Sequence, residues 1–126
     1  MEDRLVKTFY RACKSNPPTD KDYQLLVERK GSPPPDLPEE IRQSYYAFSA
    51  YDTVEGMKAQ IRQVRGMGRH IFRYDIPEGA GISWKQTLGP GHYDLVGDKE
   101  ELKQYLVGYV CDAWDEDEGD QGSGET

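Results

Sequence analysis

Apolar and polar positions alternate along several short stretches of this chain, as they do in β-strands that bury one face. In the clearest stretch, Phe72, Tyr74 and Ile76 alternate with Arg73 and Asp75. Other stretches rich in β-branched and aromatic residues are bounded by Gly, Pro, Asn or Asp, which is typical of short strands joined by turns. The pattern therefore predicts strands at residues 5–13, 45–51, 71–76, 82–87, 93–96 and 107–113.

A helical period replaces this alternation in the middle of the chain. Residues 54–64 place four apolar side chains on one stripe, as in a helix that covers a core. Asp52, with Glu55 three residues later, resembles a capping box, and the glycines of residues 66–68 end the pattern. We therefore predict a helix here, with its apolar stripe formed by Val54, Met57, Ile61 and Val64.

Three shorter helices are predicted from capping residues and from flanking prolines. The first begins after Thr19, the second begins at Asp36 or Pro38 and ends near Ser44, and the third begins after Asp98. The first and third carry apolar residues at helical spacing, namely Tyr23, Leu26 and Val27, and Leu102, Tyr105 and Leu106.

The order of these elements is β-α-α-β-α-β-β-β-α-β, which is not the regular alternation of a doubly wound sheet. A chain of 126 residues also suits one domain better than two. We therefore predict a single α+β domain over residues 1–114, with a mixed or mainly antiparallel sheet and three to four short helices. Nine Tyr, three Phe and two Trp predict a small, aromatic core.

The C-terminal part of the chain differs from the rest in its charge. The net charge of −7 comes from the last stretch, because seven of the 23 acids lie from Asp112 onward without a base, and the other 16 acids match the 16 bases. Residues 115–126 combine acids with Gly and Ser, so we predict a disordered tail. Its commonest role would be solubility, although a nucleic-acid mimic or a partner-docking tail is the alternative.

Several classes of protein are disfavoured by the sequence. The N-terminus has no apolar run long enough for a signal peptide or a membrane span, which predicts a cytoplasmic protein. Cys13 and Cys111 stand apart and are expected to be buried free thiols, and the two histidines form no metal-binding or triad motif. We therefore expect no metal site.

Two features carry candidate chemistry. His92 follows a glycine-rich turn that allows close approach of a ligand, whereas His70 begins a strand and is expected to be structural. A basic ridge could meet phosphates, but a solvated helix face or a dock for the acidic tail explains it as well, and the neutral body disfavours nucleic acid as a partner. The ridge consists of Lys58, Arg62, Arg65, Arg69 and Arg73.

Three segments together resemble the small ADP-ribosyltransferase-like fold over residues 5–113. They are residues 9–11, which end the first strand with an arginine, residues 48–53, which lead into a helix, and residues 71–77. The resemblance implies NAD as cofactor. It further implies that Arg11 binds the NAD phosphates or ribose and that Ser49 braces the nicotinamide pocket, with Tyr51 and Thr53 nearby.

The third motif of that family is not matched. The strand that would carry its glutamate spans residues 91–98, where the acids are Asp94 and Asp98, and Asp98 already serves as a helix cap. The resemblance therefore places His92 or Asp94 near the ribose and counts Tyr93 among the cofactor-binding residues. It implies an altered or inactive enzyme, because transfer needs a placed carboxylate. The structural alternatives are a surface ion pair for Arg11 and ordinary strand packing for Ser49 and Tyr51.

Two functional hypotheses follow. The first is an NAD-binding, ADP-ribosyltransferase-like domain, which requires these side chains to converge on one cleft. The second is a noncatalytic interaction module, such as a toxin–antitoxin or phage-defence component, that binds a protein through the acidic tail and an aromatic face. That face would be formed by Tyr45, Tyr46 and Tyr93.

Overall fold

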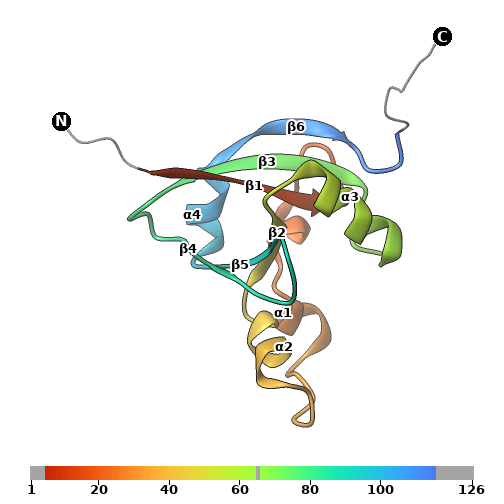
Figure 1. Cartoon of the computed structure of the whole chain (residues 1–126), viewed down its shortest axis with the longest axis vertical. Coiled ribbons are helices and arrows are strands. Elements are labelled where there is room, and N and C mark those ends of the chain that lie inside the picture. The colour runs from red at the N-terminus through yellow and green to blue at the C-terminus, as the bar shows by residue number, and fades with distance from the viewer. Residues whose placement is uncertain (1–4, 65, 116–126) are drawn as a thin grey trace.

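The computed structural model describes residues 5–64 and 66–115, which form one antiparallel sheet with short helices around it (Figure 1). The predicted α+β class is confirmed. The elements in chain order are β1 (Val6–Cys13), the 3₁₀-helix η1 (Asp20–Tyr23), α1 (Leu26–Lys30), α2 (Glu39–Ser44), β2 (Phe48–Tyr51), α3 (Val54–Gln63), β3 (His70–Pro77), β4 (Ser83–Gln86), β5 (His92–Val96), α4 (Lys99–Lys103) and β6 (Leu106–Asp112).

The strands of the sheet lie in the order β4-β5-β2-β1-β3-β6. Every neighbouring pair is antiparallel, so the sheet is antiparallel rather than mixed. The pairing of β1 with β3 is the longest and joins eight residues of each strand, from Val6↔Pro77 to Cys13↔His70. The two strands that carry the Ser49 and His92 positions, β2 and β5, are adjacent, with Tyr51 opposite His92.

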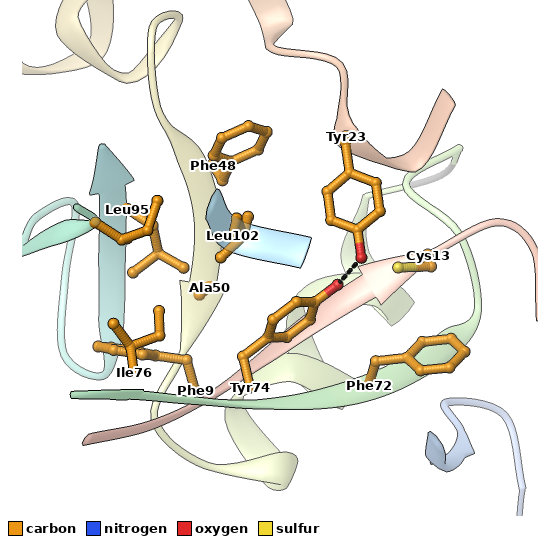
Figure 2. Close-up of a cluster of buried hydrophobic side chains, with 11 residues drawn as sticks. Phe9, Cys13, Tyr23, Phe48, Ala50, Phe72, Tyr74, Ile76, Leu95 and Leu102 are labelled. Atoms are coloured by element: carbon orange, nitrogen blue, oxygen red, sulfur yellow. Dashed lines mark hydrogen bonds between the residues drawn. The ribbon is translucent and has the colours of Figure 1, made fainter. Parts of the chain in front are cut away.

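One face of the sheet, here called the core face, carries the larger hydrophobic cluster (Figure 2). Phe9 and Tyr74 are fully buried on it, and η1 and α4 cover it with Tyr23 and Leu102. The hydroxyls of Tyr23 and Tyr74 are 2.7 Å apart and hydrogen-bond to each other inside this cluster. The expectation of an aromatic core is confirmed.

The opposite face, here called the helix face, is covered by α3. Met57 and Ile61 of α3 pack with Ile71 of β3 and with Ala113, which follows β6. The predicted stripe is thus confirmed in its central positions, because a helix with a 3.6-residue period buries one side. The helix begins after Thr53 and not after Asp52, since the Thr53 hydroxyl accepts a hydrogen bond from the Gly56 main-chain nitrogen at 3.0 Å.

The helix predicted after Thr19 is two separate elements. The 3₁₀-helix η1 ends at Tyr23, and α1 starts at Leu26 after an extended connection. The Asp22 carboxylate holds this turn because it accepts hydrogen bonds from the main-chain nitrogens of Thr19 at 2.9 Å and Lys14 at 2.6 Å. Burying Tyr23 in the core ends the first element before the helical period can continue.

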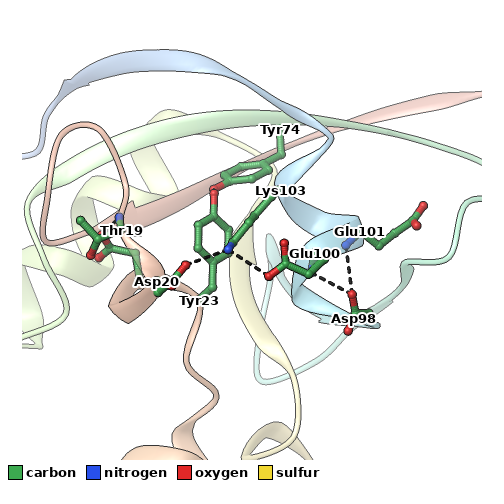
Figure 3. Close-up of polar contacts among 9 residues, drawn as sticks. Thr19, Asp20, Tyr23, Tyr74, Asp98, Glu100, Glu101 and Lys103 are labelled. Carbon is green, nitrogen blue, oxygen red and sulfur yellow. Dashed lines mark hydrogen bonds and ion pairs between the residues drawn. The ribbon is translucent and has the colours of Figure 1, made fainter.

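Two short elements are joined across the core face by a lysine (Figure 3). The Lys103 ammonium on α4 lies 2.8 Å from Asp20 of η1 and 3.1 Å from Glu100 of its own helix. The predicted cap of α4 is confirmed, because the Asp98 carboxylate accepts from the main-chain nitrogens of Glu100 and Glu101. These contacts keep η1 and α4 together above the aromatic core.

The strand predicted at residues 45–51 starts later than expected, at Phe48. The main-chain nitrogens of Tyr45 and Tyr46 bond to the carbonyls of Arg42 and Gln43, so the turns of α2 continue through these tyrosines. Figure 1 shows α1 and α2 in a lobe that extends away from the sheet at the bottom of the view.

Two further predictions concern membrane spans and the acidic C-terminal tail. Within residues 5–64 and 66–115, no helix has the length and apolar character needed to cross a bilayer. The acidic tail predicted to be disordered lies, beyond Asp115, outside the described residues.

Candidate functional site

A serine and a histidine meet on the helix face where β2 and β5 pair. Successive side chains of a strand point to opposite faces of the sheet. Phe48 and Ala50 are buried on the core face, so Ser49 and Tyr51 point to the helix face. In the β2–β5 register, His92 faces Tyr51, and Ser49 is one pleat away on the same face. The Ser49 Oγ lies 2.6 Å from the His92 Nε2, so the two side chains are hydrogen-bonded.

The other ring nitrogen of His92 determines the direction of this bond. His92 Nδ1 lies 3.0 Å from the main-chain carbonyl oxygen of Thr87 and 3.2 Å from the Thr87 hydroxyl. A carbonyl oxygen can only accept, so Nδ1 carries the hydrogen in the neutral ring and Nε2 is the acceptor. This tautomer is assigned from the hydrogen-bond network. The Ser49 hydroxyl therefore donates its hydrogen to the His92 Nε2.

The turn between β4 and β5 holds His92 in place. The Thr87 main-chain nitrogen donates to the His92 carbonyl at 3.0 Å, and the chain between them turns through positive φ at Leu88, Gly89 and Gly91. Gly91 has a φ of 79°, and a Cβ built on it would lie 3.2 Å from the Asp52 carboxylate. The glycine-rich loop thus positions the histidine by its turn geometry.

The exposures of the two side chains suit a nucleophile and its base. His92 is only 7% exposed and its ring lies edge-on to the Tyr51 ring at 5.2 Å, whereas Ser49 is exposed. Tyr51 in turn donates its hydroxyl hydrogen to Gln60 of α3 at 3.0 Å, and burial raises the pKa of this phenol. The base is fixed in orientation while the hydroxyl stays accessible.

Asp94 lies on the same face and is opposite Ser49 in the register. It is 6% exposed, and its Oδ2 accepts a hydrogen bond from the Ser44 hydroxyl of α2 at 2.9 Å. Lys85 of β4 is its cross-strand partner on the other side. Asp94 thus connects α2 to the sheet and adds a carboxylate beside the Ser49–His92 pair.

Arg11 is not brought to this site. It lies between Phe9 and Cys13 on β1 and therefore points to the core face. It is 6% exposed and donates to the Tyr74 hydroxyl at 3.3 Å and to the Asp22 carbonyl at 2.7 Å. The alternative of a surface ion pair is wrong, because the guanidinium is buried among aromatic rings.

The remaining predicted residues are also separated. Thr53 serves as the N-cap of α3, and Tyr93 packs on the core face with its ring edge-on to Phe9 at 5.2 Å. Tyr93 is half-buried against the core cluster, whereas Tyr46 is 51% exposed. Of the residues predicted for NAD binding, the structure brings together Ser49, Tyr51, His92 and Asp94. It leaves Arg11 and Tyr93 on the core face and uses Thr53, two residues after Tyr51, as a helix cap.

The basic ridge is largely engaged by the protein's own acceptors. Arg69 is paired with Asp112 at 2.6 Å and Arg73 with Asp75 at 3.0 Å. The Arg62 Nε donates to the Ala113 carbonyl at 2.9 Å. Lys58 also has a partner, and Arg65 lies outside the described residues.

The cysteines and His70 have structural surroundings. Cys13 is buried, and Cys111 is half-buried, as free thiols. Burial raises the pKa of the Cys13 thiol to about 11, so it remains protonated and unreactive at neutral pH. His70 begins β3, as expected, and its ring lies 6.0 Å from that of Tyr109. The described residues contain no group of three or more His, Cys, Asp or Glu that could hold a metal ion.

Reasoning from the sequence missed Ser44 and Thr87. The signal for Thr87 was present, because a hairpin with strands ending at Thr87 and restarting near His92 makes these residues cross-strand neighbours. Ser44 could not be found this way, since its contact with Asp94 spans 50 positions. Comparison with known proteins found no matching family model, no matching curated protein and no matching solved structure.

Proposed function

We propose that the Ser49–His92 pair is the reactive centre of a serine-dependent acyl hydrolase or acyltransferase. The observation that carries the proposal is the 2.6 Å bond from Ser49 Oγ to His92 Nε2, combined with the Thr87 carbonyl on Nδ1. Nucleophile, base and a group that orients the base are the three parts that activate a serine. Here the orienting group is a main-chain carbonyl instead of a carboxylate.

The proposed reaction proceeds in two steps. The Ser49 oxygen attacks the carbonyl carbon of an ester, and the Ser49 proton passes to His92 Nε2. When the bond to the leaving alcohol breaks, His92 gives this proton to the alcohol and an acyl group remains on Ser49. Water, or an acceptor alcohol, then loses a proton to His92 and attacks the acyl group. When the bond between the acyl group and the Ser49 oxygen breaks, His92 returns this proton to that oxygen, which restores both side chains.

Covalent labelling tests the identity of the nucleophile. A fluorophosphonate probe is expected to add once per chain at Ser49, with fluoride as the leaving group, because an activated hydroxyl attacks phosphorus as it attacks an ester. Intact mass and peptide mapping would measure the addition. Ser49→Ala is expected to remove it, and Ser83→Ala is the matched control because Ser83 is also an exposed strand serine. Equal labelling of Ser49→Ala and the unchanged protein would overturn the proposal.

A second candidate is the NAD-dependent function that the ADP-ribosyltransferase-like resemblance implies. The clustering of Ser49, Tyr51, His92 and Asp94 on one face favours it, since these are the side chains assigned to the nicotinamide and the ribose. Arg11 would then stabilise the domain from the core face instead of contacting phosphates.

Calorimetric titration separates this candidate from the first. NAD and ADP-ribose are expected to bind the unchanged protein, and Asp94→Asn is expected to weaken NAD more than ADP-ribose, because a carboxylate beside the ribose favours the positive nicotinamide form. His70→Ala serves as the control for general destabilisation. Absence of heat at millimolar NAD would remove this candidate and leave the hydrolase proposal untouched.

A further inference from the structure

A pocket that is separate from the Ser49–His92 pair lies where three segments of the chain meet. It is lined by Lys14 after β1, by Gly66, Gly68 and Arg69 before β3, and by Trp114 after β6. Its volume is about 430 Å³, within the range of about 300–1,000 Å³ that small-molecule sites occupy. Its chemistry is two cationic side chains, an indole ring and closely approaching main chain.

Hydrogen bonds hold the main chain at Trp114, and the indole ring lies near the Arg62 guanidinium. The main-chain nitrogen of Trp114 donates a hydrogen bond to Asp112 Oδ1 at 2.8 Å. The main-chain nitrogen of the buried Ala113 donates one to the Arg69 carbonyl oxygen at 2.7 Å. The Arg62 Nε donates to the Ala113 carbonyl, and the Arg62 guanidinium lies 5.8 Å from the Trp114 ring centre. Trp114 is nonetheless 53% exposed. The pocket therefore presents a half-exposed indole ring to solvent.

The loop of glycines brings the cations together. Gly68 has a φ of 102°, and a Cβ on it would lie 2.6 Å from the Cys13 carbonyl group. The loop can therefore lie directly against the end of β1, which brings Lys14 and Arg69 to the lining of one pocket. Asp112 takes the Arg69 Nε hydrogen, but a guanidinium carries four further N–H groups in a planar fork.

We infer that this pocket binds a nucleotide, with the base stacked on Trp114 and the phosphate bound by Lys14 and Arg69. Nucleic-acid bases of every type can stack on an aromatic side chain. Cationic groups beside such a ring can bind the phosphate of the same nucleotide. The occupant is a free mononucleotide, because the pocket offers one indole ring for one base and two cationic side chains for its phosphate. This site is independent of the chemistry proposed for Ser49.

Fluorescence of Trp114 provides the direct test. The chain has two tryptophans, so Trp84→Phe leaves Trp114 as the only one. Adenosine 5′-monophosphate is expected to quench this emission saturably, whereas adenosine and ribose 5-phosphate, which each lack one half of the recognised chemistry, are expected to bind about tenfold more weakly or worse. An oligoadenylate binding more tightly per site than the mononucleotide would overturn the assignment to a free nucleotide.

Charge reversal tests the role of the cations. Lys14→Glu is expected to weaken binding of adenosine 5′-monophosphate about tenfold, and Lys99→Glu is the matched control because Lys99 is an exposed lysine on α4. Trp114→Leu, followed by calorimetry, is expected to abolish binding, and the 53% exposure of Trp114 makes this change compatible with folding. Absence of quenching by millimolar mononucleotide, or equal affinities of Lys14→Glu and Lys99→Glu, would overturn the inference.

Discussion

Replacement of His92 by alanine is expected to slow acylation of Ser49 by about 10²–10⁴-fold, which is the usual contribution of a positioned general base. The Ser49 hydroxyl loses its hydrogen-bond acceptor at 2.6 Å, so the group that would take its proton during attack is removed. The measurement is the second-order rate of fluorophosphonate addition at Ser49, followed by mass spectrometry. An aryl ester provides a second substrate for the same step.

Two comparisons distinguish a base from a structural histidine. Added imidazole is expected to restore part of the rate in His92→Ala, because a free base can enter the space left by the ring, whereas it cannot repair a displaced strand. His70→Ala removes the other histidine, whose ring contacts Tyr109, and is expected to react as the unchanged protein does. A rate for His92→Ala within twofold of that control would show that His92 is not the base.

Substitution of Gly68 by alanine is expected to destabilise the fold by about 3 kcal/mol, the sum of a positive φ and an overlap with main chain. The φ is 102°, and the added Cβ would lie 2.6 Å from both the carbon and the oxygen of the Cys13 carbonyl, which cannot turn aside as a side chain can. Urea denaturation measures the free energy of unfolding. A loss of this size is a large fraction of the total stability of a small domain.

Gly66→Ala is the matched control for this substitution. Gly66 also has a positive φ, of 89°, but nothing lies within 4 Å of its would-be Cβ. The loss of unfolding free energy in Gly66→Ala should therefore come from the positive φ alone, about 1 kcal/mol. Equal costs for the two glycines would mean that the loop does not lie against the end of β1.

Local patterns were sufficient for most of the individual elements. The apolar period at Met57 and Ile61 located α3, and the alternation through Phe72 and Tyr74 located β3, because each signal comes from neighbours in the chain. Boundaries were less well predicted where tertiary contacts decide them. The first helix stops at Tyr23, for example, because the core takes that side chain.

The face to which each strand residue points could not be read from these patterns. In residues 9–13 both alternating sets contain apolar side chains, with Phe9 and Cys13 in one set and Tyr10 and Ala12 in the other. Arg11 could therefore have faced either way, and a shift of one residue reverses the answer. The same ambiguity applied to Ser49, which lies between Phe48 and Ala50.

The sequence by itself determined the α+β class, the position of α3 and the glycine-rich turn before His92, because periodicity and turn chemistry are local properties. Only the tertiary structure decided that Ser49 and His92 meet on one face while Arg11 is buried under the other. Such meetings depend on strand order and register, which are chosen by the packing of two hydrophobic clusters far apart in the chain.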